Sequence, residues 1–135
     1  MAIRQLLAAD ACRALLGGRA PALMRRVASA PGEVGMSAIT FAELRVALVQ
    51  SEARSEGHRR LKELTSEVAV LPFDERVARA YGAVRTSLEQ RGGELGPLEI
   101  LVAAHALSLG AALVTDAPGF DRVRGLAVER WEEVE

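Results

Sequence analysis

The chain has 135 residues, of which 50% are hydrophobic and 4% aromatic, and its formal net charge is −1. That length supports one hydrophobic core but not two, so the sequence predicts a single domain over residues 1–135. The near-neutral charge excludes a polycation that coats nucleic acid indiscriminately. No apolar run reaches the roughly 18 residues of a membrane span, and the N-terminus lacks a signal-peptide pattern, so we expect a cytoplasmic protein without a membrane segment.

The first third of the chain alternates between strand-like and helix-like segments. An apolar strand is predicted over residues 3–7 and leads into a helix that ends at Gly17, whose backbone freedom suits a helix stop. A second helix follows Pro21, and a second strand covers residues 34–39. The only cysteine, Cys12, lies in the first helix and is expected to serve as a small buried hydrophobic residue.

The middle of the chain is expected to be mostly helical. Thr40 and Glu43 have the spacing of a capping box, which predicts a helix up to about Gln50. The most polar segment, residues 52–67, predicts a solvated helix, and residues 68–71 predict a third strand.

The last third repeats the alternation. A long helix is predicted over residues 74–91, and Pro97 is well placed to start the next helix, over residues 97–109. Strands over residues 111–115 and 126–129 follow, separated by a loop or short helix. The whole pattern predicts an α/β fold with a central, mostly parallel sheet of about five strands, covered by helices on both faces.

Three acidic residues, Glu43, Glu99 and Asp116, stand after strand-like segments and near the starts of helix-like ones. In a parallel sheet these positions share one edge, so the carboxylates are expected to gather there. A cluster of like charges persists best when cations neutralise it, and oxygen-only ligands favour Mg²⁺ or Mn²⁺. The sequence therefore predicts a divalent metal site suited to phosphodiester hydrolysis.

Each acid also has a structural interpretation when it is taken alone. Glu43 completes the capping box, Glu99 lies at the positive end of a helix dipole, and Asp116 can cap the turn before Pro118. The coincidence of the three at one sheet edge favours the functional interpretation.

Other catalytic chemistry has little support in the sequence. His105 lies in an apolar helix and does not share the face of Glu99, so a packing or interface role is expected. A lone cysteine and the absence of paired metal-ligand spacings argue against zinc, and no glycine-rich phosphate loop follows a strand.

Three segments carry a resemblance to a known family. They are residues 37–45 (SAITFAELR), residues 95–107 (LGPLEILVAAHAL) and residues 112–116 (ALVTD). In their order and spacing they resemble the PIN-domain family, and within it the VapC-type toxins of toxin–antitoxin pairs. The resemblance spans nearly the whole chain, including residues 71–74 and the closing segment with Trp131.

The resemblance implies a PIN-like α/β/α sandwich and an Mg²⁺-dependent endoribonuclease that hydrolyses RNA. It also implies a homodimer held inactive by a small antitoxin protein. By position, Glu43, Glu99 and Asp116 would be the catalytic metal ligands, with Glu99 where the family usually has Asp. Asp116 stands one residue before the family's last acid, which would fall at Ala117.

The departure from the family pattern lies at the end of the first strand. Ala8 and Ala9 stand where the family has Asp followed by Thr or Ser, so a principal metal ligand is lost and metal affinity is expected to fall substantially. Asp10, two residues later, is expected to be an auxiliary ligand acting through a water. Three explanations are open: an engineered substitution that disarms a toxic enzyme, a natural homologue with weak or no activity, or rescue by Asp10.

Two other functions compete with the ribonuclease. A catalytically inactive PIN-like module that holds an antitoxin or a nucleic acid is favoured by Ala8. A receiver-like or phosphatase-like domain needs a nucleophilic Asp at the end of the first strand, and that residue is missing. If RNA is bound, the candidate phosphate contacts are Arg13, Arg25 and Arg26.

Overall fold

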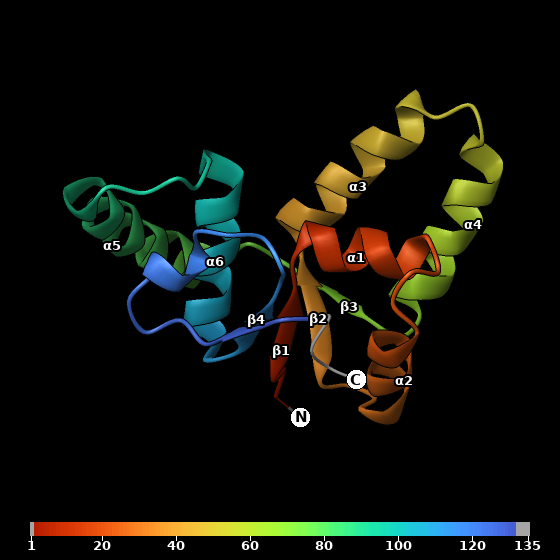
Figure 1. Cartoon of the computed structure of the whole chain (residues 1–135), viewed down its shortest axis with the longest axis horizontal. Helices are drawn as coiled ribbons and strands as arrows, with labels where there is room; N and C mark the ends of the chain where they lie inside the picture. Colours follow the sequence, from red (N-terminus) through yellow and green to blue (C-terminus); the bar gives the residue numbers. More distant parts are fainter. Residues whose placement is uncertain (1, 132–135) are drawn as a thin grey trace.

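A five-stranded sheet forms the centre of the fold. In the computed structural model, which describes residues 2–131, the strands are β1 (Gln5–Leu7), β2 (Val34–Ser37), β3 (Ala69–Leu71), β4 (Ala112–Val114) and β5 (Val128–Glu129). Their order in the sheet is β3-β2-β1-β4-β5, and every pairing is parallel. The sheet lies between two groups of helices (Figure 1), so the predicted α/β/α sandwich is confirmed.

Seven helical segments connect these strands within the described residues. They are α1 (Ala9–Leu16), α2 (Pro21–Ser29), α3 (Ala38–Gln50), α4 (Arg54–Thr65), α5 (Glu75–Arg91), α6 (Pro97–Leu109) and the short 3-10 helix η1 (Phe120–Arg122). Helices α5 and α6 lie on one side of the sheet, and α1 to α4 lie on the other (Figure 1). Over residues 2–131, no helix combines the length and apolarity needed to cross a bilayer.

Strand β1 supplies the two cores of the sandwich from its opposite faces. Leu6 packs with Leu113 in the core beneath α5 and α6. Leu7 packs with Met36 and Val114 in the core beneath α1 and α2. All five side chains are 0% exposed, as expected when successive residues of a central strand point to opposite faces.

Cys12 on α1 belongs to the second of these cores and is fully buried. Burial, with a smaller contribution from the charge of Asp10, raises the pKa of its thiol to about 12. Because the reactive form of cysteine is the thiolate, this side chain is inert near neutral pH. The prediction of a buried hydrophobic role is confirmed.

The predicted strands and helices are all present, with shorter strands than the sequence indicated, but the start of α3 was predicted wrongly. The helix begins at Ala38, and Ser37 caps it: Ser37 Oγ accepts a hydrogen bond from the backbone N–H of Ile39 at 3.1 Å. Thr40, the predicted cap, is buried within the helix, and its Oγ1 has no hydrogen-bond partner among the described residues. The capping box with Glu43 therefore does not form, because β2 runs directly into the helix and a serine three residues earlier supplies the cap.

Ser37 also connects α3 to α6. His105 Nδ1 lies 2.8 Å from Ser37 Oγ, and the imidazole ring packs edge-on against Phe73 with the ring centroids 5.8 Å apart. His105 is 1% exposed, and this burial lowers its pKa, against a smaller opposing effect of the negative charge of Asp74. The packing role predicted for His105 is confirmed.

The free energy of unfolding is expected to fall as the pH is lowered from about 7 to about 5, because the unfolded chain binds a proton at His105 that the folded chain binds less readily. The stabilising contribution is complete above the unfolded pKa of about 6.5 and declines below it by at most about 1.4 kcal/mol per pH unit. Urea denaturation across this range measures the slope.

His105→Gln keeps a hydrogen-bonding group but cannot titrate, so it is expected to flatten this pH dependence. His58→Gln, on the polar surface helix α4, is the matched control and is expected to leave it intact. Equal slopes for the wild type and His105→Gln would contradict the assignment.

Candidate functional site

The candidate site lies where the strand order reverses direction. From β1, the chain continues through β2 and β3 on one side, and β4 and β5 lie on the other. In open α/β sheets this arrangement leaves a crevice at the carboxyl ends of the central strands. A cavity of about 280 Å³ lies there, lined by Ala8, Ala9, Asp10 and Arg13 after β1, by Glu43 on α3, by Glu99 and Val102 on α6, and by Ala117 and Phe120 after β4.

Two carboxylates from different helices line this cavity without an ion pair to any described residue. Glu43 is on α3, which leaves directly from the end of β2, and Glu99 is in the first turn of α6. Glu99 Oε1 accepts a hydrogen bond from the backbone N–H of Gly96 at 2.9 Å, which fixes the side chain at the helix start. The structure thus brings together two of the three predicted acids.

Asp10 also lines the cavity, but both oxygens of its carboxylate accept hydrogen bonds from the protein. Oδ1 accepts from Thr115 Oγ1 at 2.8 Å. Oδ2 accepts from the backbone N–H of Asp116 at 2.8 Å and from Trp131 Nε1 at 3.1 Å. These bonds tie α1 to the end of β4 and to the segment after β5, so a metal ion at Asp10 would compete with three protein donors.

Asp116 does not line the cavity. Its Oδ1 accepts a hydrogen bond from the backbone N–H of Trp131 at 2.9 Å, and its Oδ2 is buried without a hydrogen-bond partner among the described residues. The turn before Pro118 is capped by Thr115, whose Oγ1 accepts from the backbone N–H of Ala117 at 3.0 Å. The turn-capping interpretation of Asp116 was therefore wrong, and its metal-ligand role stays a prediction.

The donor set fits one hard divalent cation better than a multinuclear centre. Across residues 2–131, no three histidine, cysteine, aspartate or glutamate side chains lie together in a way that could hold a metal ion. Mg²⁺ in proteins is, however, commonly held by one or two carboxylates with waters completing its shell, and Glu43 and Glu99 offer two. The buried Oδ2 of Asp116 is a further acceptor without a partner among the described residues, but it lies outside the cavity lining. Ala8, 5% exposed, contributes only a methyl group.

The three candidate phosphate contacts differ in their positions. Arg13 lines the cavity, whereas Arg25 is exposed on α2 and lines none of the acidic cavity. Arg26 is held by Glu129, with Nη2 and Oε1 3.0 Å apart. The structure therefore singles out Arg13.

Sequence reasoning missed Thr115 and Trp131 as partners of the acidic residues. The hydrogen bond between Trp131 and Asp10 joins positions 121 residues apart, so no local spacing could indicate it. Trp131 is the only tryptophan in the chain, and this was the one available signal.

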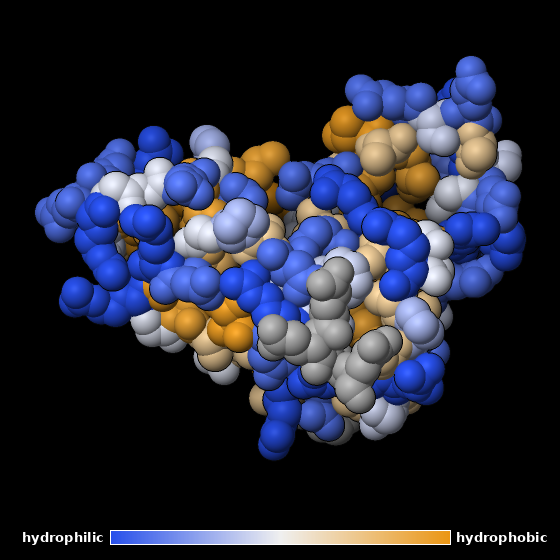
Figure 2. Space-filling model, viewed as in Figure 1, coloured by the Kyte–Doolittle hydropathy of each residue, from blue (hydrophilic) through white to orange (hydrophobic). Residues whose placement is uncertain are grey.

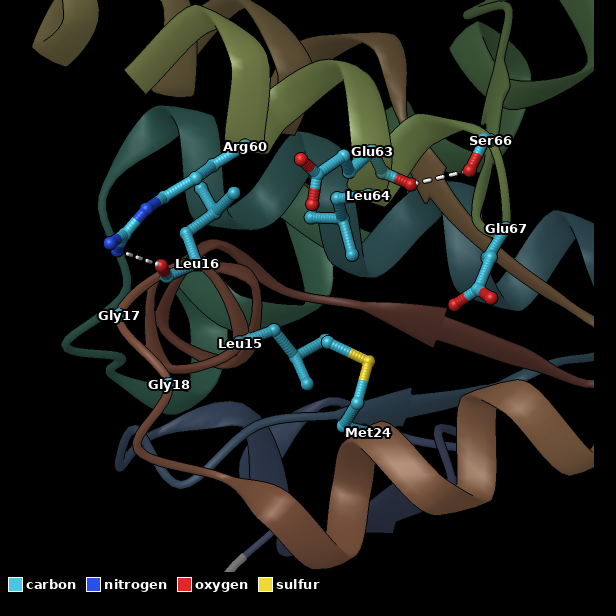
Figure 3. Close-up of a pocket in the computed structure, with 10 residues that line it drawn as sticks. All are labelled: Leu15, Leu16, Gly17, Gly18, Met24, Arg60, Glu63, Leu64, Ser66 and Glu67. Atoms are coloured by element: carbon cyan, nitrogen blue, oxygen red, sulfur yellow. Dashed lines mark hydrogen bonds between the residues drawn. The ribbon is translucent and has the colours of Figure 1, made fainter. Parts of the chain in front are cut away.

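A larger cavity, of about 500 Å³, shares no lining residue with the cavity of Glu43 and Glu99. Figure 3 shows its lining from α1, α2 and α4, with the apolar side chains of Leu15 and Met24 on one side and Glu63 and Arg60 on the other. Arg60 Nη1 donates a hydrogen bond to the carbonyl oxygen of Leu16 at 3.0 Å. The lining of this larger cavity is both apolar and charged, which is more typical of a surface that binds a partner protein than of a catalytic site.

Asp10→Ala is expected to lower the free energy of unfolding by about 2–4 kcal/mol, because it leaves the donors of Thr115, Asp116 and Trp131 without their acceptor. Asp10→Asn retains one acceptor oxygen, so its free energy of unfolding is expected to fall by less than that of Asp10→Ala. Urea denaturation followed by the fluorescence of Trp131 measures both. An Asp10→Ala variant as stable as the wild type would show that these hydrogen bonds do not hold the sheet edge together.

Comparison with known proteins places the chain in a family. Residues 11–126 match the PIN domain. The chain is 31% identical over 101 residues to Ribonuclease VapC2 of Rickettsia felis, covering 74% of this chain and 75% of that protein. It is also 31% identical over 101 residues to the tRNA(fMet)-specific endonuclease VapC of Shigella flexneri, covering 74% and 76%.

A solved relative extends this likeness to the fold. The structure of VapBC2 from Rickettsia felis bound to a DNA fragment from its promoter contains a chain that superposes with a TM-score of 0.89 at 25% identity. The superposition covers 96% of this chain and 99% of that one. The chain therefore belongs to the PIN-domain family and is a homologue of the VapC ribonucleases.

Proposed function

We propose that the chain is a metal-dependent endoribonuclease of the toxin type whose metal centre is weakened by Ala8. The observation that carries this proposal is the cavity at the carboxyl edge of the sheet, which Glu43 and Glu99 line together. The relatives named as ribonucleases support RNA as the substrate. Glu43, Glu99 and Asp116 are the proposed catalytic metal ligands.

A bound Mg²⁺ or Mn²⁺ would supply Lewis acidity toward the phosphodiester and a lowered pKa for the attacking water. Glu43 and Glu99 would hold the ion, and the hydrogen bond from Gly96 to Glu99 limits the positions that this carboxylate can take. Asp116 does not line the cavity, so it would have to turn Oδ2, the oxygen that lacks a partner among the described residues, toward the ion to join them. Asp10 holds the loop after β4 in place through its bonds to Thr115 and Asp116.

The weak metal binding that we propose results from the residue that follows β1, Ala8. Ala8 lines the same cavity as Glu43 and Glu99, so an aspartate at this position would add a carboxylate to those of Asp10, Glu43 and Glu99. Asp10 does not replace that carboxylate, since its oxygens already accept three hydrogen bonds. We therefore propose slow metal-dependent turnover rather than rescue by Asp10.

A second candidate function is a catalytically inactive PIN-like module that holds an antitoxin or a nucleic acid. Ala8 favours it, because loss of one carboxylate lowers metal affinity while leaving the fold intact. The two candidates differ only in turnover, so they share the same binding partners.

A small antitoxin protein is the proposed partner, supported by the likeness to the chain in the solved VapBC2 structure from Rickettsia felis. Apolar side chains gather between α3 and α4 (Figure 2), and Val46 and Val49 on α3 are 57% and 59% exposed. Together with the 500 Å³ cavity, they offer the apolar surface that a partner would cover. A second copy of the chain, forming a homodimer, is the other proposed partner.

Ala8→Asp is expected to raise the rate of RNA cleavage in Mg²⁺ or Mn²⁺ at least about tenfold over the wild type, because it restores an anionic ligand to the cavity. Cleavage of labelled tRNA and single-stranded RNA by the two chains side by side measures this.

Two further variants test the cause of that increase. Glu99→Gln added to Ala8→Asp is expected to abolish cleavage, since it removes a proposed metal ligand. Ala28→Asp adds the same charge on the exposed face of α2 and is expected to leave the rate of RNA cleavage unchanged. If neither the wild type nor Ala8→Asp cuts any RNA supplied, the ribonuclease proposal fails and the binding module takes its place.

A further inference from the structure

Helix α1 divides its residues between the core and the acidic cavity. The buried face consists of Ala11, Cys12, Ala14 and Leu15. Asp10 and Arg13, three positions apart, lie on the face that lines the cavity. Burial of the apolar face fixes the rotation of the helix, so Arg13 is directed to the same cavity as Glu43 and Glu99.

Arg13 is a cation without a protein counter-ion within the described part of the chain. Asp10, the acid on the same helix face, accepts its hydrogen bonds from Thr115, Asp116 and Trp131 instead. Several other arginines are engaged in ion pairs, as Arg26 is with Glu129. The Arg13 side chain is exposed, so its guanidinium is available to a ligand that enters the cavity.

The charges around the cavity explain why such a cation is needed. A phosphodiester that approaches Glu43 and Glu99 is repelled by both carboxylates, and Arg13 is the one basic residue among the described residues that line the cavity. Val102 and Phe120, 4% and 3% exposed, form an apolar wall, which strengthens electrostatic contacts made beside it. A guanidinium binds two phosphate oxygens at once through parallel N–H donors.

We infer that Arg13 is the phosphate-binding residue of the acidic cavity, where it holds a backbone phosphate of RNA next to Glu43 and Glu99. This contact deepens the proposed function, on which it rests, by naming the group that positions the substrate. It forms no covalent bond and moves no proton, so it is a positioning contact, and it is measured with the metal ion removed.

The test is binding of a fluorescently labelled single-stranded RNA in the presence of EDTA, measured by fluorescence anisotropy. Arg13→Ala is expected to weaken binding about tenfold, the loss typical of one charge-assisted contact. It is also expected to reduce the slope of log affinity against log salt by about 0.7, the value for one phosphate contact on a single strand. Arg13→Lys keeps the charge but not the bidentate geometry, so its affinity for RNA is expected to lie between those of the wild type and Arg13→Ala.

Arg25→Ala is the matched control, because Arg25 is an exposed arginine outside the cavity lining, and it is expected to change affinity by less than about twofold. Urea denaturation of each variant checks that the fold is retained. The assignment is overturned if Arg13→Ala binds RNA as tightly as the wild type, if Arg25→Ala weakens binding equally, or if the wild type binds no RNA without metal.

Cleavage assays in Mn²⁺ on the same proteins separate this inference from the proposed function. Loss of binding in Arg13→Ala, with no cleavage by the wild type or by Ala8→Asp, would uphold the phosphate contact and refute the ribonuclease. Cleavage by Ala8→Asp, with RNA binding by Arg13→Ala unchanged from the wild type, would uphold the ribonuclease and refute the phosphate contact.

Discussion

The carboxylate of Asp10 holds together the edge of the sheet on which the candidate site is built. It accepts hydrogen bonds from the side chain of Thr115, the backbone of Asp116 and the indole of Trp131, three groups that follow β4 and β5. Strands of two or three residues offer few ladder hydrogen bonds at their ends, so side-chain acceptors have to fix the loops that leave them. The positions of the cavity walls after β4 depend on this contact.

This structural use of Asp10 determines which carboxylates remain for chemistry. Of the acids that the sequence brings to the sheet edge, Glu43 and Glu99 line the cavity. Asp116 does not, and one of its carboxylate oxygens accepts a hydrogen bond from the backbone N–H of Trp131. With alanine at the end of β1, the cavity has fewer anionic ligands than a multinuclear metal centre requires. We therefore propose that this donor set binds a metal ion only weakly, and that the positive charge of Arg13 is correspondingly more important for holding a phosphate.

Much of the fold followed from the sequence because the apolar periodicities are local. Strand β2 ended earlier than predicted, since apolar residues such as Ile39 continue past β2 into α3 without a change in pattern, whereas β1, β3 and β5 began later than predicted. The start of α3 was misplaced because two hydroxyl residues, Ser37 and Thr40, both have N-cap chemistry, and only the direction of the chain leaving β2 decides between them.

The site was predictable in its location but not in its contacts. Parallel topology places the ends of β1, β2 and β4 at one edge, and this sufficed to bring Glu43 and Glu99 together. The orientation of each carboxylate depends on partners distant in the sequence, as Trp131 is from Asp10 and Asp116, and spacing alone carries no information about them.

Calorimetric titration of Mn²⁺ into the wild type, Glu43→Gln, Glu99→Gln and Asp10→Asn tests most directly which carboxylates bind the metal ion, because it requires no turnover. A single weakly bound ion is expected, with binding lost in both glutamine variants and retained within about threefold by Asp10→Asn. Loss of binding in Asp10→Asn as complete as in Glu99→Gln would contradict this expectation, because Asp10 would then be a metal ligand.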